Sequence, residues 1–108
     1  MPVTTIDAKT LKAWLDKGDA IVMDVREPTE YEAENIPGSK LLPLGSVSKA
    51  TLPDCGGKKL VIHCRGGGRG GTACEKLLKE DPDMEIYHLG GGLRDWIADG
   101  NPVASSGK

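Results

Sequence analysis

Residues 61–73 read Val-Ile-His-Cys-Arg-Gly-Gly-Gly-Arg-Gly-Gly-Thr-Ala, and this stretch decides the fold that we expect. The run Leu60–Cys64 is largely apolar, as in a strand that is covered on both faces of a sheet. A glycine-rich loop follows, and residues 70–80 then place apolar side chains on one face of a helix. A buried strand, a tight loop and a helix in this order indicate an α/β domain.

The same alternation continues along the rest of the chain. Strand-like runs are Ala20–Val25 and Glu85–Leu89, with a shorter one over Lys40–Leu42. Strands that alternate with helices predict a mainly parallel sheet. Helical patterns begin after Asp7, extend from Pro28 to Glu34, run from Leu93 to just before Gly100, and occupy the short stretch Ser46–Ala50.

Glycine is the most unusual feature of the composition. The chain has 108 residues and 15 glycines, about twice the average usage, yet only 7 prolines and no phenylalanine. Ten of the glycines lie in three clusters, which are Gly56-Gly57, Gly66–Gly71 (interrupted by Arg69) and Gly90–Gly92. Clustering of this kind indicates particular backbone requirements rather than a low-complexity sequence. We expect one domain over residues 1–103 and a disordered tail or linker at 104–108.

Charge and cysteine content exclude several classes of protein. A net charge of −2 argues against a nucleic-acid partner, because domains that coat nucleic acids carry a basic excess. No apolar run is long enough to span a membrane, and the first residues lack the features of a secretory signal. The three cysteines, Cys55, Cys64 and Cys74, favour reduced thiols and a cytoplasmic protein. Their spacing includes no C-x2-C pair, so we expect no metal site.

The loop after Cys64 has the features of an anion site built around a thiol. Cys64 falls at the carboxyl end of a strand, where α/β sheets bind ligands. Consecutive glycines let the loop curl so that its N–H groups point inward, and a helix amino terminus follows. Arg65 and Arg69 add two positive charges. A thiol in this setting is expected to lose its proton easily and to act as a nucleophile.

Other interpretations of this segment explain less of it. Cys64 as a small buried hydrophobe would leave the glycines and the two arginines unexplained. A nucleotide-binding P-loop requires a lysine after its glycines, and none follows here. A dinucleotide fingerprint fits poorly, because this loop starts with cysteine and arginine.

Four segments of the chain follow, in order, the motifs of one family. They are Asp24–Glu27 with Glu30-Tyr31, Ile36–Ser39, Cys64–Arg69, and Leu89–Gly92 with Trp96 and Gly100–Val103. On these segments, which cover about residues 3–103, the chain resembles a single rhodanese domain, a thiosulfate sulfurtransferase module. One departure is Asn35, which stands where the family often has histidine.

The resemblance implies a rhodanese-like fold with a central, mostly parallel five-stranded sheet flanked by helices on both faces. It also implies that Cys64 attacks the outer sulfur of an anionic donor such as thiosulfate, releasing sulfite and leaving a cysteine persulfide. Cyanide, a thiol or a partner protein then takes the sulfur, without a cofactor. The residues expected to hold the donor and the persulfide sulfur are Arg65, Gly66, Gly67, Gly68 and Arg69.

Two further functions remain open from the sequence. Related phosphatases and arsenate reductases have a Cys-x5-Arg loop, whereas here Arg69 lies five positions after Cys64, which suits a single sulfur atom better. A non-catalytic docking module is the other alternative, although such modules usually lack the cysteine. Asp24 and Arg26 follow a strand end, and we interpret them as an ion pair that supports the loop rather than as substrate contacts. The small side chains of the loop suggest a shallow, accessible site.

Overall fold

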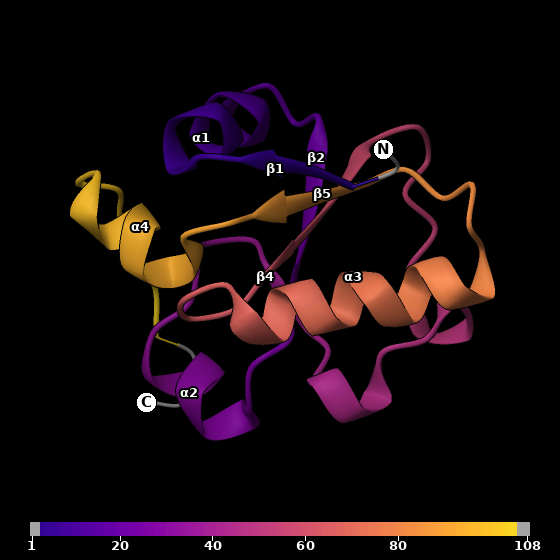
Figure 1. Ribbon diagram of the computed structural model, residues 1–108. Helices are drawn as coiled ribbons and strands as arrows, with labels where there is room; N and C mark the ends of the chain where they lie inside the picture. Colours follow the sequence, from indigo (N-terminus) through magenta and orange to yellow (C-terminus); the bar gives the residue numbers. More distant parts are fainter. Residues whose placement is uncertain (1–2, 106–108) are drawn as a thin grey trace.

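A five-stranded sheet organises the domain, and all of its strand pairs are parallel. The computed structural model describes residues 3–105, and the strand order is β1-β5-β4-β2-β3 (Figure 1). The predicted central sheet of five mostly parallel strands is therefore confirmed. The strands are β1 (Val3–Ile6), β2 (Ala20–Asp24), β3 (Lys40–Leu41), β4 (Lys59–His63) and β5 (Ile86–Leu89).

The helices begin and end close to the positions that the sequence indicates. Asp7 caps the first helix, because its carboxylate accepts a hydrogen bond of 2.8 Å from the backbone N–H of Thr10. The short helix expected over 46–50 is instead two separate 3-10 turns. The helical elements are α1 (Ala8–Asp16), α2 (Pro28–Ala33), η1 (Leu44–Ser46), η2 (Lys49–Thr51), α3 (Gly68–Glu80) and α4 (Gly92–Ala98).

Helices cover both faces of the sheet, as expected, and each face has its own apolar core (Figure 1). Successive residues of a strand point to opposite faces, so β4 contributes to both cores. Ile62 and Cys64 pack on the α3 side, with Leu77 of that helix. Val61 packs on the other side, with Trp96 of α4. Burial on both faces explains why this strand is apolar with no regular alternation.

One strand was not predicted from the sequence. β1 pairs with β5 along its whole length, from Val3 opposite Ile86 to Ile6 opposite Leu89. Only its two end residues are partly buried, and the two between them are exposed threonines. Four residues with this pattern give a weak periodic signal, and the strand exists because β5 offers it an open edge.

The end of the domain extends slightly past the boundary that the sequence suggests. Ala104 pairs with Asn35 through two backbone hydrogen bonds of 2.8 Å, and the Ser105 hydroxyl donates to the carbonyl of Glu32 at 3.0 Å. The remainder of the expected tail, residues 106–108, lies outside the described part of the chain. Among residues 3–105, no helix is long and apolar enough to cross a bilayer.

The packing of α3 on the sheet generates a stability prediction. Leu77 is fully buried, so Leu77→Ala should lower the free energy of unfolding by about 2–5 kcal/mol. Lys79→Ala, on the exposed side of the same helix, is the control and should change it by less than about 0.5 kcal/mol. Urea denaturation measures both, and similar values for the two variants would contradict the proposed core.

Candidate active site

The sulfur of Cys64 lies inside the loop that joins β4 to α3. The backbone N–H groups of Gly67 and Gly70 donate to Sγ at 3.0 and 3.2 Å. Two N–H groups aimed at one sulfur stabilise negative charge on it. Gly70 lies one residue beyond the predicted set 65–69, and no hydrogen bond to Sγ comes from Gly66 or Gly68. Cys64 itself is only 1% exposed, so the expectation of an accessible site at this thiol is wrong.

Glycine at position 67 is required by a backbone contact. Gly67 has φ +107°, a conformation that residues with a Cβ rarely adopt. A Cβ built there would overlap the carbonyl oxygen of Gly90. The loop after Cys64 is therefore shaped against the turn that follows β5.

The turn of Gly90–Gly92 is fastened to the same loop by hydrogen bonds. The N–H groups of Leu93 and Arg94 donate to the carbonyls of Cys64 and Arg65 at 2.8 and 3.1 Å. Gly92 has φ +62°, and a Cβ there would lie 2.5 Å from the Arg65 carbonyl oxygen and against that of Cys64. The sequence marked this segment only as a glycine cluster with particular backbone requirements, and its hydrogen bonds to the loop after Cys64 were missed.

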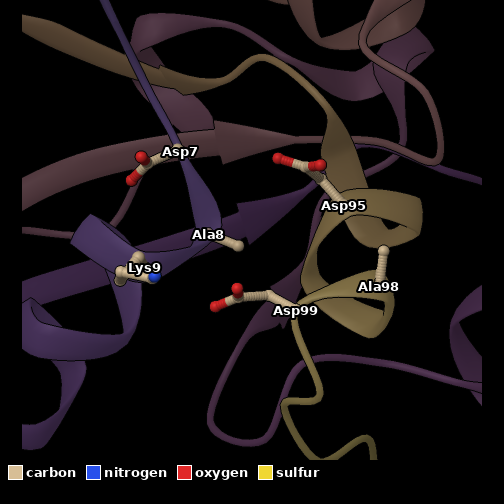
Figure 2. A pocket seen from close by; sticks show the side chains of 6 residues that line it. All are labelled: Asp7, Ala8, Lys9, Asp95, Ala98 and Asp99. Carbon is tan, nitrogen blue, oxygen red and sulfur yellow. The ribbon is translucent and has the colours of Figure 1, made fainter.

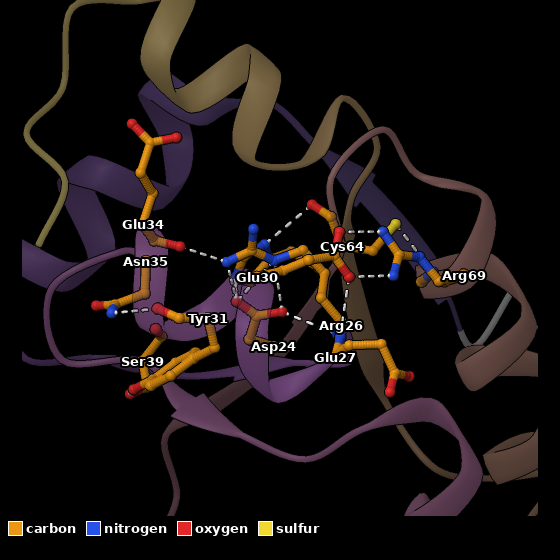
Figure 3. A network of polar contacts seen from close by, with 12 residues as sticks. Asp24, Arg26, Glu27, Glu30, Tyr31, Glu34, Asn35, Ser39, Cys64 and Arg69 are labelled. Atoms are coloured by element: carbon orange, nitrogen blue, oxygen red, sulfur yellow. Dashed lines mark hydrogen bonds and ion pairs between the residues drawn. The ribbon is translucent and has the colours of Figure 1, made fainter. Parts of the chain in front are cut away.

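Arg69 is engaged in an ion pair that the sequence did not predict. Its two terminal nitrogens donate to the two carboxylate oxygens of Glu30, in α2, at 2.6 and 3.0 Å (Figure 3). This guanidinium holds the pKa of Glu30 at about 2, well below its ordinary 4.5. Arg69 is therefore not a free positive charge beside the thiol. It joins the first turn of α3 to α2.

Asp24 and Arg26 form a buried ion pair behind the loop (Figure 3). Arg26 donates to both oxygens of Asp24, at 2.9 Å from Nε to Oδ1 and 2.7 Å from Nη2 to Oδ2. Nη2 also donates to the carbonyl of Glu34 at 2.6 Å. Their side chains are 0% and 4% exposed, so they are poorly placed to meet a substrate in solution. The pair joins the end of β2 to the carbonyl of Glu34, and its role as a support for the loop stays a prediction.

Two histidines lie near the loop without contacting Sγ in a hydrogen bond. His63 is fully buried, its Nε2 is 3.6 Å from Asp24 Oδ2, and burial lowers its pKa. His88 of β5 packs under the first turn of α3, because a Cβ at Gly70 would lie 2.6 Å from its Nε2. Burial also lowers the pKa of His88. Both imidazoles are therefore neutral supports for the loop at ordinary pH.

The other two thiols differ in character from the candidate nucleophile. Cys74 is 3% exposed within the core on the α3 side, and burial raises its pKa to about 11. Burial also raises the pKa of Cys55, which is partly exposed. All three cysteines are free. Within residues 3–105, no cluster of three or more His, Cys, Asp or Glu residues could hold a metal ion.

Two hollows on the surface differ in their relation to Cys64. Figure 2 shows a cavity of about 330 Å³ between α1 and α4, lined by Asp7, Asp95 and Asp99 among others. Cys64 and its loop do not line it. A smaller cavity of about 150 Å³ lies beside the loop and includes Arg65 and Arg94. Arg94 was not predicted as a site residue, since it lies outside the loop after Cys64, in the helical stretch between Gly92 and Trp96.

A comparison with known families identifies the chain. Residues 7–99 match the model of the rhodanese-like domain. The chain belongs to the rhodanese-like family. In this rhodanese-like domain, three of the four motif segments noted in the sequence include the turn after β2, the loop after β4 and the turn after β5.

Relatives of similar length include named sulfurtransferases. The thiosulfate sulfurtransferase GlpE of Pseudoalteromonas translucida is 30% identical, over 84% of this chain and 85% of its own length. A sulfurtransferase of Allochromatium vinosum is 29% identical, over 95% and 96%. The crystal structure of a rhodanese-related protein from Thermoplasma volcanium has a TM-score of 0.79 and 28% identity, covering 94% of this chain and 97% of that one.

Other relatives are longer. An uncharacterized protein of Synechocystis is 35% identical over 94% of this chain but only 56% of its own length. The probable adenylyltransferase/sulfurtransferase MoeZ of Mycobacterium tuberculosis is 30% identical over 92% of this chain and 26% of its own length. The rhodanese-like domain thus occurs both in short proteins and as a part of longer ones.

The contact between the loop after Cys64 and the turn at Gly90–Gly92 predicts that a single added methyl group at Gly92 lowers the stability of the fold. Gly92→Ala should lower the free energy of unfolding by about 2 kcal/mol or more, because it adds strain at positive φ and a clash with two carbonyls. Gly45→Ala is the control, since Gly45 is exposed and nothing lies within 4 Å of a Cβ there. Equal stabilities of the two variants in urea denaturation would contradict the contact.

The ion pair of Glu30 with Arg69 predicts a pH dependence of stability. A carboxyl whose pKa is lower in the folded state stabilises the fold above its unfolded pKa and loses that effect as pH falls. At neutral pH, Glu30→Gln should cost about 1 kcal/mol after discounting for partial exposure. The difference from wild type should shrink between pH values of about 5 and about 2.

Urea denaturation at a series of pH values measures this difference. Glu32→Gln, on the exposed side of the same helix, serves as the control for a change of one charge. A loss in Glu30→Gln that stays constant down to acid pH would argue that the carboxylate contributes through shape rather than through charge.

Proposed function

We propose that this protein is a sulfurtransferase in which Cys64 carries the transferred sulfur as a persulfide. The observation that carries the proposal is the pair of N–H groups, from Gly67 and Gly70, that donate to Sγ. A ring of this size fits one sulfur atom and its charge. Membership of the rhodanese-like family and the named sulfurtransferases among its relatives support the same activity.

The first half-reaction loads the cysteine. The Cys64 thiolate attacks the outer sulfur of thiosulfate, and a new bond forms between Sγ and that sulfur. The sulfur–sulfur bond of the donor breaks, and its electron pair leaves with sulfite. The loop N–H groups stabilise the negative charge, first on the thiolate and then on the persulfide.

The second half-reaction removes the sulfur from the Cys64 persulfide. An acceptor nucleophile, cyanide in an assay or a thiol in the cell, attacks the terminal sulfur, and the electron pair of the broken bond returns to Sγ. Two separate half-reactions give ping-pong kinetics. A cytoplasmic location belongs to the same proposal, since reducing conditions there keep the thiol free.

Access to Sγ depends on the loop itself. Cys64 is 1% exposed, so the outer sulfur of a donor reaches it only when the loop shifts. Positions 66–68 carry no side chains that such a movement would have to displace. Arg65 is exposed at the start of the loop and offers a positive charge to an approaching dianion.

Intact-mass measurement after incubation with thiosulfate tests the proposal. Wild type should gain the mass of one sulfur atom and lose it on addition of cyanide. Cys64→Ser should gain none while it stays folded, and Cys74→Ser, the control, should still be loaded at Cys64. Undiminished loading of Cys64→Ser would overturn the assignment of the nucleophile.

The two alternative functions give different results in the same experiment. A phosphatase would release phosphate from an aryl phosphate without taking up sulfur. A docking module would neither take up sulfur nor release phosphate. Either result with folded wild-type protein would overturn the proposed function.

A further inference from the structure

A cationic hollow borders the active loop on the side of α4. It has a volume of about 150 Å³ and is lined by Arg26, Glu34, Arg65, Leu93, Arg94 and Ile97. Arg94 reaches over the loop, because a Cβ at Gly66 would lie 3.7 Å from its Nη2. The guanidinium of Arg94 is therefore next to the loop that encloses Sγ.

The four arginines near the loop differ in whether their charge is already neutralised. Arg26 is paired with Asp24, and Arg69 with Glu30. Neither Arg65 nor Arg94 forms an ion pair or a side-chain hydrogen bond with another residue of the range 3–105. Both are exposed. The positive charge available to an anion at this site thus belongs to Arg65 and Arg94.

The same hollow has an apolar wall beside these charges. Leu93 is buried, and Ile97 of α4 is 43% exposed, one of only two large exposed apolar side chains among the described residues. A compact inorganic dianion such as thiosulfate gains nothing from such a wall. An aliphatic chain with an anionic end matches both the apolar and the cationic parts. Glu34 lines the hollow too, and its negative charge disfavours a second anionic group.

We propose that Arg94, together with Arg65, binds the carboxylate of a small alkyl thiol that accepts the sulfur from Cys64. This inference rests on the proposed sulfurtransferase activity and names its acceptor class. The acceptor thiolate attacks the terminal sulfur of the anionic persulfide and forms a new sulfur–sulfur bond. The bond to Sγ breaks, its electron pair stays on Sγ, and the acceptor leaves as an alkyl persulfide anion. Arg94 determines specificity and is not itself a reacting group.

Discharge of the preloaded enzyme tests the acceptor class. Cys64 is loaded with thiosulfate, the excess is removed, and loss of the sulfur to mercaptopropionate or to the uncharged mercaptopropanol is followed by intact mass. The ratio of the two rate constants should fall about tenfold in Arg94→Gln, since one charge-assisted contact is lost. Arg94→Lys should recover part of the ratio, and Lys79→Gln, an exposed cation at the far end of α3, should leave it at the wild-type value.

A second measurement does not depend on sulfur transfer. Iodoacetate carries a carboxylate and iodoacetamide does not, and both alkylate a thiolate. The ratio of their rates at Cys64, located by peptide mass, should fall in Arg94→Gln and stay constant in Lys79→Gln. The low exposure of Cys64 slows both alkylation reactions, and its effect cancels in the ratio of their rates.

The outcomes separate this inference from the proposed function. Wild type that takes up no sulfur overturns the proposed function and the acceptor role with it. Normal loading, combined with discharge and alkylation ratios that Arg94→Gln does not change, overturns this inference alone. Slower loading by thiosulfate in Arg94→Gln, with an unchanged discharge ratio, would assign Arg94 to the donor and also overturn it.

Discussion

The contact between two glycine turns, backbone against backbone, is the constraint on which the site depends. Gly67 and Gly92 both have positive φ, and a Cβ at either would overlap a carbonyl of the other turn or its neighbours. Because the turns meet without side chains between them, N–H groups that follow β5 can bond the carbonyls of Cys64 and Arg65. The loop is thereby held in a shape that points two other N–H groups at Sγ. This contact requires glycine at two of the fifteen glycine positions, Gly67 and Gly92.

The charges around the loop divide into two groups with different consequences. Glu30 with Arg69 is an ion pair that joins α2 to α3, whereas Asp24 with Arg26 joins the end of β2 to the carbonyl of Glu34. These pairs add little net positive potential at Sγ, since the guanidinium of each arginine contacts a carboxylate. In the proposed function, the backbone N–H groups of Gly67 and Gly70 are therefore the main stabilisers of charge on the sulfur, and the exposed Arg65 and Arg94 are left to meet anions from solution.

The sequence predicted those strands, helix ends and loops that depend on residues close together along the chain. The apolar runs of β2, β4 and β5, the cap at Asp7, and the strand–loop–helix around Cys64 are all local patterns, and the structure contains them. β1 was missed because a four-residue edge strand is defined by its partner β5. The pairing of Arg69 with Glu30 was missed for a similar reason, since 39 positions separate them and only the fold brings α2 beside α3.

The amide protons of Gly67 and Gly70 provide the most direct test of the central claim, that these two groups hold the charge on Sγ. Their chemical shifts are followed by nuclear magnetic resonance as Cys64 ionises, with Cys64→Ser as the reference. The account predicts that both move strongly downfield with the ionisation in wild type and that neither does so in the variant. Unchanged shifts at Gly67 and Gly70, with the response at Gly66 or Gly68 instead, would contradict it.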